Sequence, residues 1–344
     1  MNPLFENTEQ LPLINMPMLR SNRSIRAWQT RQLNRVIQTV LRHKMRGFTA
    51  LIDAGRRSEL STAVQKFRIE QVRANALKPA LMNAVLHETQ RTPAADGSGE
   101  WVTPARARDD AAILYTHGGA FVMDRSDQMT AFAARLAVMA GLKTKIVDYR
   151  LAPEHPCPAA VDDVEAALLN LYGSGVAPSK IVMVGDSAAG SINLAVLQRL
   201  KEKGLPLPAG LALFSPWVDL TLSAYSLLSA GLSGESPYTM EMAALCAKLY
   251  IQDRFMPTDP VPSPVLGDLT DLPPILIHVS EKDSFFDDSK LLTRRIQEAG
   301  GKVLLRVWPA GGHVWEYEFS EDADISIMET ARFIQGRIEG ATLF

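Results

Sequence analysis

Short apolar runs alternate with longer amphipathic stretches from residue 111 onward. The apolar runs predict strands at 111–116, 145–149, 180–185, 210–215, 275–280 and 303–308, and the stretches between them predict helices at about 126–140, 159–173, 188–203, 286–299 and 322–338. Because these strands are continuously apolar, both faces of their sheet must be covered. The pattern indicates an α/β fold whose mostly parallel, twisted sheet carries helices on both faces.

The chain before residue 111 has a different pattern, helical from Arg23 to about Ala84. The apolar positions from Leu33 to Leu41 follow the spacing of one amphipathic helix face. Pro79 is expected to break a second helical stretch. A turn-rich patch at 92–99 then joins strand-like pieces at Val85–Thr89 and Glu100–Val102, which predicts a hairpin and about eight strands in all.

One segment interrupts the alternation of strands and helices. Residues 221–262 hold a Ser/Gly-rich loop, followed by a helix from about Pro237 to Ile251. The segment is too long for a simple connection, so we expect a loop-plus-helix insertion near the functional site.

Composition and charge narrow the class of protein. The chain has 344 residues, 47% of them hydrophobic, and a net charge of −2. No apolar run reaches the roughly 18–20 residues of a membrane span, and the N-terminus lacks the pattern of a signal peptide. The two cysteines have no metal-type spacing, which favours reduced thiols in a cytoplasmic protein.

The charge is unevenly distributed. Residues 1–95 hold 15 Lys and Arg against 6 Asp and Glu, whereas the remainder of the chain is acidic. The basic residues are interleaved with other types and form no block. This pattern favours a helical segment docked on an acidic body over a nucleic-acid partner or a membrane-binding arm.

Candidate chemistry lies where the predicted strands end, because functional groups of open α/β sheets gather there. After the strand at 180–185 comes Gly185-Asp186-Ser187-Ala188-Ala189-Gly190, a strand-to-helix turn that resembles the G-x-S-x-G nucleophile elbow. Ala189 stands in the slot of the second glycine. The turn makes Ser187 the candidate nucleophile.

A glycine-rich loop follows the strand at 111–116. Its residues are His117-Gly118-Gly119-Ala120, and the glycines would let backbone N–H groups point at a substrate oxygen. Gly119, Ala120 and Ala188 are the expected oxyanion donors, with Gly118 as an additional one. His117 is interpreted as a structural brace of this loop.

The two remaining groups follow the last two strands. Asp283 comes directly after the strand at 275–280, where it could orient a histidine, and Asp287 and Asp288 are its reserves at the start of the next helix. His313 follows Gly311-Gly312 after the final strand, which suits a general base. The other four histidines are interpreted as structural or solvated: His43, His87, His155 and His278. The chain order Ser187, Asp283, His313 is the order expected of the α/β-hydrolase fold.

Together these motifs resemble the hormone-sensitive-lipase-like family of bacterial carboxylesterases. The further motifs that carry the resemblance are Asp148-Tyr149-Arg150-Leu151-Ala152-Pro153-Glu154, Ser215-Pro216-Trp217-Val218-Asp219, Leu272-Pro273-Pro274 and Gly312-His313. The resemblance implies an α/β-hydrolase catalytic domain over residues 81–344 and a helical cap over 1–80, with a contribution from about 221–262. Arg150, Glu154 and Asp219 are interpreted as scaffold.

The family implies hydrolysis of short- to medium-chain acyl esters of small molecules, without a cofactor or metal, in a protein that often forms a homodimer. The substrate pocket is expected between the cap and six residues of the catalytic domain: Phe121, Asp186, Trp217, Phe285, Val314 and Trp315. Two alternatives stay open, a lactone hydrolase with the same triad and a non-catalytic receptor for small ligands on the same fold. The presence of His313 disfavours the receptor.

Overall fold

The computed structural model describes residues 39, 43–44, 46–74, 79–233, 236, 238–309 and 311–341. The predicted amphipathic face from Leu33 to Leu41 lies outside these residues. None of the helices described is long and apolar enough to cross a bilayer.

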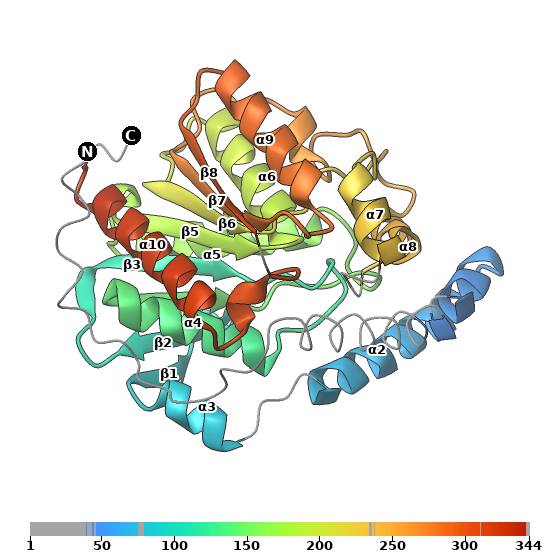
Figure 1. The fold of residues 1–344 in the computed structure, drawn as a ribbon, viewed down its shortest axis with the longest axis horizontal. Coiled ribbons are helices and arrows are strands. Elements are labelled where there is room, and N and C mark those ends of the chain that lie inside the picture. The colour runs from blue at the N-terminus through green and yellow to red at the C-terminus, as the bar shows by residue number, and fades with distance from the viewer. Residues whose placement is uncertain are drawn as a thin grey trace.

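A single eight-stranded sheet forms the centre of the molecule (Figure 1). Its strands are β1 (Thr89–Pro93), β2 (Gly99–Pro104), β3 (Arg108–Thr116), β4 (Leu142–Val147), β5 (Ile181–Asp186), β6 (Gly210–Phe214), β7 (Ile275–Ser280) and β8 (Val303–Trp308). They pair in the order β1-β2-β4-β3-β5-β6-β7-β8, and β2 runs antiparallel to both of its neighbours, whereas all pairs from β4 to β8 are parallel. The mostly parallel sheet of about eight strands is confirmed.

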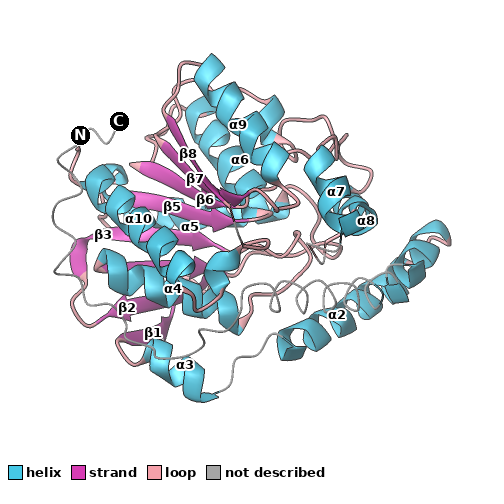
Figure 2. Cartoon of the chain, in the orientation of Figure 1, coloured by secondary structure: helices cyan, strands magenta, loops and turns pink. Residues whose placement is uncertain are grey.

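Helices cover both faces of the sheet, as Figure 2 shows in cyan around the magenta strands. Successive strand residues point to opposite faces. Ile113 and Val184 therefore join the apolar cluster of α4 (Asp127–Ala140) and α10 (Glu321–Ile338). Leu114 and Met183 join the cluster of α5 (Ala159–Gly173), α6 (Ala189–Glu202) and α9 (Phe286–Glu298). These five helices begin and end close to where the sequence pattern predicts them.

The predicted strand at Val85–Thr89 is wrong. Residues Pro79–Leu86 form a helix, α3, and the first strand of the hairpin begins only at Thr89. Val85 and Leu86 pack against the apolar cluster on the α4 face of the sheet, so they are held by side-chain packing and not by strand pairing. Pro79 is the first residue of α3, a position that tolerates proline because the N–H groups of the first helical turn have no intrahelical acceptor. The described part of the preceding helix, α2 (Arg57–Ala74), ends at Ala74, so the two helices are separate elements.

The insertion at 221–262 contains two helices, α7 (Tyr225–Ser233) and α8 (Met240–Ile251). The Ser/Gly-rich stretch that was predicted as a loop is thus largely the helix α7. Contacts with the rest of the protein stabilise this helix. Leu227 and Ala230 lie one helical turn apart and are both buried. The Ser226 N–H donates to Asp287 of α9. Together with α2 (Arg57–Ala74), α7 and α8 lie at the end of the sheet to which the parallel strands point (Figure 1).

Candidate active site

Ser187 lies in a tight turn between β5 and α6. Its φ is 53°, a left-handed conformation that costs on the order of 1–3 kcal/mol in a residue with a side chain. Two backbone hydrogen bonds hold it there: its N–H donates to the Phe214 carbonyl at 2.9 Å, and its carbonyl accepts from Trp217 N–H at 2.9 Å. Glycine suits position 185, because a Cβ there would lie 2.5 Å from Nδ2 of Asn193 and 3.0 Å from Cβ of Ala189.

Ala189 fits this turn although it replaces the second glycine of the motif. It is the first residue of α6, is fully buried and needs no left-handed backbone. Its methyl group faces Gly185, where an added Cβ would lie 3.0 Å away. The close approach falls one residue later, since a Cβ on Gly190 would lie 2.7 Å from Cβ of Pro216.

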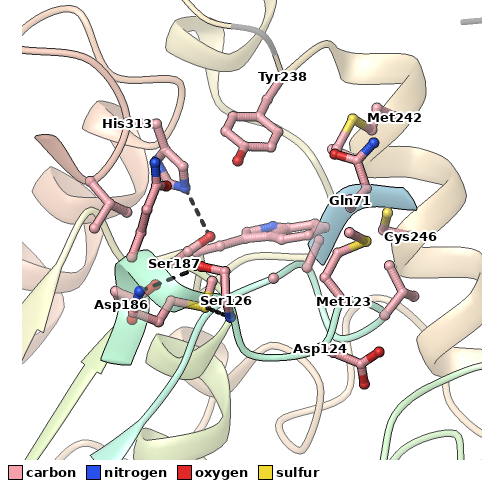
Figure 3. A pocket seen from close by; sticks show the side chains of 18 of the residues that line it. Gln71, Met123, Asp124, Ser126, Asp186, Ser187, Tyr238, Met242, Cys246 and His313 are labelled. Atoms are coloured by element: carbon pink, nitrogen blue, oxygen red, sulfur yellow. Dashed lines mark hydrogen bonds between the residues drawn. The ribbon is translucent and has the colours of Figure 1, made fainter. Parts of the chain in front are cut away.

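A continuous hydrogen-bonded chain links Ser187, His313 and Asp283. The Ser187 Oγ lies 2.9 Å from Nε2 of His313, a contact drawn as a dashed line in Figure 3. The Nδ1 of His313 lies 3.1 and 3.2 Å from the two carboxylate oxygens of Asp283. The structure therefore brings together three side chains that are far apart in the sequence.

The carboxylate of Asp283 is held by two further donors. It accepts from the Ser215 hydroxyl and from the Phe285 N–H, the latter at 2.8 Å. Ser215 follows β6 directly and has a φ of 49°. Sequence reasoning gave Ser215 no role of its own, although its position at a strand end was a signal that could have found it.

The reserve carboxylates lie elsewhere and bind other groups. Asp287 accepts from Ser226 N–H at 2.9 Å. Asp288 accepts from the N–H groups of Val218 and Asp219 at 2.9 and 3.1 Å, and burial raises its pKa to about 8. Asp288 thus holds the loop that follows β6, and Asp287 holds the start of α7. Of the three carboxylates, Asp283 is the one that contacts His313.

Of the three N–H groups expected as donors in the loop after β3, one already has an acceptor, whereas those of Gly119 and Ala120 have none among the described residues. The N–H of Gly118 donates to Oδ2 of Asp186 at 3.0 Å, so the expectation that Gly118 serves as an oxyanion donor is wrong. Across the described residues, no acceptor is recorded for the N–H groups of Gly119, Ala120 and Ala188. Ala120 reaches this geometry with a φ of 53°, a left-handed conformation that costs it roughly 1–2 kcal/mol.

The buried carboxylate of Asp186 fixes the loop after β3 through hydrogen bonds. Besides Gly118, it accepts from the hydroxyls of Tyr115 at 2.6 Å and Tyr317 at 2.5 Å. The carboxylate is buried, and burial raises its pKa against the lowering effect of the two tyrosine donors. Neither tyrosine could be assigned from sequence, because Tyr115 lies inside a strand and Tyr317 lies in a short turn near the C-terminus.

The other histidines lie away from the nucleophile. His117 is buried, its Nδ1 lies 2.7 Å from the Gly118 carbonyl, its ring stacks on Tyr149, and burial lowers its pKa to about 4. His278 is buried in β7, where burial lowers its pKa to about 3. His43, His87 and His155 are exposed. In the part of the chain that the structure describes, no group of three or more His, Cys, Asp and Glu could hold a metal ion.

A cavity of about 610 Å³ opens above Ser187. Four of the six residues predicted to line it do so: Asp186, Trp217, Phe285 and Val314. The expectation is wrong for Phe121 and Trp315, which lie behind the wall. Phe121 stacks on Tyr250 with ring centroids 3.9 Å apart, and Trp315 packs against Trp308.

Helices that cover the site supply the remaining apolar wall, which sequence reasoning did not identify. The contributing residues are Phe48, Val64 and Phe67 from the N-terminal helical segments and Met242, Cys246 and Leu249 from α8. Figure 3 labels Met242 and Cys246 of this wall. Nothing in their local sequence distinguishes these residues from an ordinary apolar helix face.

Arg68 fastens α2 beside this cavity. Its buried guanidinium donates to the carbonyl of Val122, at 2.5 Å, and to that of Ala152. It also pairs with Glu154 at 2.7 Å, and Glu154 accepts from the Ser61 hydroxyl at 2.7 Å. Glu154 thus acts as scaffold, through contacts to α2.

Known proteins resemble the chain over most of its length. A family model described as alpha/beta hydrolase fold matches residues 113–317. An acetyl-hydrolase of Streptomyces hygroscopicus is 35% identical over 225 residues, 64% of this chain and 73% of that protein. A carboxylesterase of Mycobacterium tuberculosis is 32% identical over 271 residues, 73% of this chain and 83% of that protein.

The solved structures that resemble it carry the same fold. The crystal structure of an esterase from the bacterial hormone-sensitive lipase family superposes with a TM-score of 0.70 and 31% identity, over 80% of this chain and 98% of that one. Sheet order, strand-end motifs and sequence similarity agree. The chain therefore belongs to the hormone-sensitive-lipase-like family of the α/β-hydrolase fold.

Proposed function

We propose that the protein, an ester hydrolase of this family, cleaves short- to medium-chain acyl esters by acyl transfer to Ser187. The observation that carries this proposal is the hydrogen-bonded chain from Ser187 through His313 to Asp283, placed under a cavity next to unpaired backbone N–H groups. In this assignment Ser187 is the nucleophile, His313 the general base and Asp283 the group that orients the histidine.

Acylation begins when His313 Nε2 takes the proton of Ser187 and the serine oxygen attacks the ester carbonyl. The negative charge that develops on the carbonyl oxygen would be stabilised by the N–H groups of Gly119, Ala120 and Ala188. His313 then transfers its proton to the leaving oxygen as the C–O bond breaks, which releases the alcohol.

Deacylation repeats these steps with water in place of the alcohol. His313 takes a proton from water as the water oxygen attacks the acyl carbon. The bond from that carbon to Ser187 Oγ then breaks, His313 returns the proton to Ser187, and the carboxylic acid is released. Asp283 keeps the Nδ1 proton of His313 pointed at its carboxylate throughout. No cofactor takes part in this assignment.

The cavity supports a substrate with a modest apolar chain. Its volume of about 610 Å³ and its walls of Phe67, Met242 and Leu249 suit an acyl chain of intermediate length. We assign residues 1–80, with help from about 221–262, to a cap over the catalytic domain at 81–344. A cyclic ester could use the same three residues, so lactones belong in the substrate panel.

Three further expectations accompany this proposal: a cytoplasmic location, a homodimer, and no nucleic-acid partner. The two free, buried cysteines, Cys157 and Cys246, support a reducing compartment.

Replacing the nucleophile tests the assignment directly. Ser187→Ala should lower turnover of p-nitrophenyl butyrate by roughly 10⁴-fold or more, because the covalent intermediate can no longer form. Ser191→Ala is the matched control, because Ser191 lies in α6 directly after the Ser187 turn and does not line the cavity. Turnover by Ser187→Ala within tenfold of the parent would refute the role of Ser187. A series from acetate to dodecanoate and a lactone panel then define the substrate.

A further inference from the structure

Tyr238 faces the catalytic groups from the covering side of the cavity. It lies between α7 and α8, and its ring meets that of His313 edge-on, with centroids 4.9 Å apart and an interplanar angle of 78°. It lines the cavity, and in Figure 3 its hydroxyl points into the cavity toward Ser187. The position is therefore within the space that a bound ester would occupy.

The hydroxyl of Tyr238 is available to a ligand. The other hydroxyls of the cavity wall have protein partners: Ser187 contacts His313, Tyr317 donates to Asp186, and Ser126 accepts from the Met129 N–H at the start of α4. Tyr238 makes a recorded hydrogen bond through its backbone N–H, to Ser236, but its hydroxyl has no recorded partner among the described residues. A half-buried hydroxyl that lacks a protein partner gains most from a hydrogen bond to substrate.

The surroundings decide which substrate atom the hydroxyl meets. The carbonyl oxygen of the ester is directed to the N–H groups of Gly119, Ala120 and Ala188. The leaving oxygen must lie near Nε2 of His313, because that nitrogen delivers its proton. The ring of Tyr238 meets that of His313, so we place its hydroxyl on the side of the leaving oxygen.

We propose that the Tyr238 hydroxyl donates a hydrogen bond to the leaving oxygen of the ester, so that Tyr238 is a further catalytic residue and favours esters of poorly leaving alcohols. The inference rests on the proposed function. As the C–O bond breaks, its electron pair stays on the leaving oxygen, His313 supplies the proton that forms the new O–H bond, and Tyr238 keeps its own proton.

The protonation state of Tyr238 suits a donor. Burial and the carboxylates of Asp186 and Asp283 raise its pKa to about 12, so it keeps its proton at every pH at which the triad works. Donation strengthens as charge develops on the leaving oxygen, because hydrogen bonds to charged groups are stronger than neutral ones. An alkoxide develops far more charge than p-nitrophenolate, which disperses it into the ring.

The test compares two butyrate esters that share one acyl group and differ in the leaving group. Tyr238→Phe keeps the ring against His313 and removes only the hydroxyl. For ethyl butyrate we expect kcat/KM to fall by about 10- to 100-fold. For p-nitrophenyl butyrate we expect a fall of less than about threefold, since that leaving group needs little assistance.

Tyr250→Phe is the matched control, because this buried tyrosine stacks on Phe121 from α8 and does not line the cavity. It should leave the ratio of the two kcat/KM values unchanged. Tyr238→Leu, which also removes the ring, should lower turnover of both esters through the loss of its contact with His313.

Equal losses on both esters in Tyr238→Phe, or no loss on either, would overturn the role of the hydroxyl. An unchanged pH profile for p-nitrophenyl butyrate, with a selective loss on ethyl butyrate, would support it, whereas a shifted profile would indicate that the tyrosine only positions His313. These results are separate from the proposed function, which fails only if Ser187→Ala retains turnover.

Discussion

The carboxyl edge of the sheet and the helices that cover it hold their side chains by different means. At the edge, Ser187, Asp283 and His313 follow strands directly and are locked by short backbone hydrogen bonds and buried carboxylates. Among the described residues of the cover, the buried Arg68–Glu154 pair fixes α2 beside the cavity. We therefore assign the chemical reaction to the residues at the sheet edge and the selection of substrate to the helices that cover it.

Left-handed backbone lies mostly at the sheet edge. Ala120, Ser187 and Ser215, in the loops that follow β3, β5 and β6, have it, whereas in the insertion it occurs at Leu222 and at Gln252, the residue that ends α8. Strained conformations persist only where the surroundings over-determine them, and the buried sheet provides such surroundings. Changes at the edge should therefore affect turnover, and changes in the cover should affect selectivity and binding.

The largest expected effect at the edge is that of Asp283→Asn. The amide would favour the wrong tautomer of His313, so kcat for p-nitrophenyl butyrate should fall by roughly 10⁴-fold while the fold persists. Asp287→Asn is the control, since Asp287 binds Ser226 and Lys290 instead. A similar loss in both variants would contradict the assignment of Asp283. The measurement is steady-state kinetics with circular dichroism of each variant.

The oxyanion loop should respond less strongly. In Gly119→Ala, a Cβ would lie 2.9 Å from that of Met123 at a φ of 110°, so the loop must shift and kcat should fall by about 10²–10³-fold. Ala120→Gly is the opposite change, because it relieves the left-handed alanine. It should keep activity and raise the free energy of unfolding by about 1 kcal/mol. Full activity of Gly119→Ala would remove Gly119 from the proposed donors.

The buried carboxyl of Asp288 predicts a pH dependence of stability on the sheet side. Its pKa is raised from 3.8 to about 8, so the folded protein keeps a proton that the unfolded chain loses between these values. The free energy of unfolding should therefore fall as pH rises across this window. Asp288→Asn, which mimics the protonated acid, should remove this decline and be more stable than the parent at pH 8 by about 1–3 kcal/mol.

Urea unfolding of both proteins at about pH 5 and pH 8 measures this difference. Asp287→Asn is the neighbouring control, because Asp287 is partly exposed and has a lowered pKa, with Lys290 and Ser226 as its partners. If the parent and Asp288→Asn show the same change between the two pH values, the carboxyl is ionised in the folded protein.

The smallest effect should come from loosening the cover. Arg68→Met breaks the pair with Glu154, so α2 should lose its fixed position beside the cavity. We expect KM for p-nitrophenyl octanoate to rise about tenfold, which is the binding free energy of one or two buried methylene groups of the acyl chain. The acetate has no such chain, so its KM should change little. Arg57→Met, on the same helix but with an exposed side chain, is the control. An equal change for both esters would show that α2 does not select chain length.

The sequence alone was sufficient for the parallel strands of the sheet and for the three groups of the proposed triad. Strands buried on both faces are continuous apolar runs, and glycine and polar residues mark where each strand ends, so Ser187 and His313 stand out locally. The hairpin strand and α7 were misplaced because short segments such as Val85–Thr89 take their structure from tertiary contacts, which local pattern does not record.

Only the tertiary structure decided what surrounds these groups. It placed the Gly118 N–H against Asp186, the Ser215 hydroxyl against Asp283, the Phe121 ring on Tyr250 and the Tyr238 ring against His313. The positions of the strand ends can be predicted from the pattern of apolar residues in the local sequence alone. Hydrogen-bond partners and cavity walls depend on which distant segments meet, and for Tyr238 that meeting joins the insertion to the last strand-end loop.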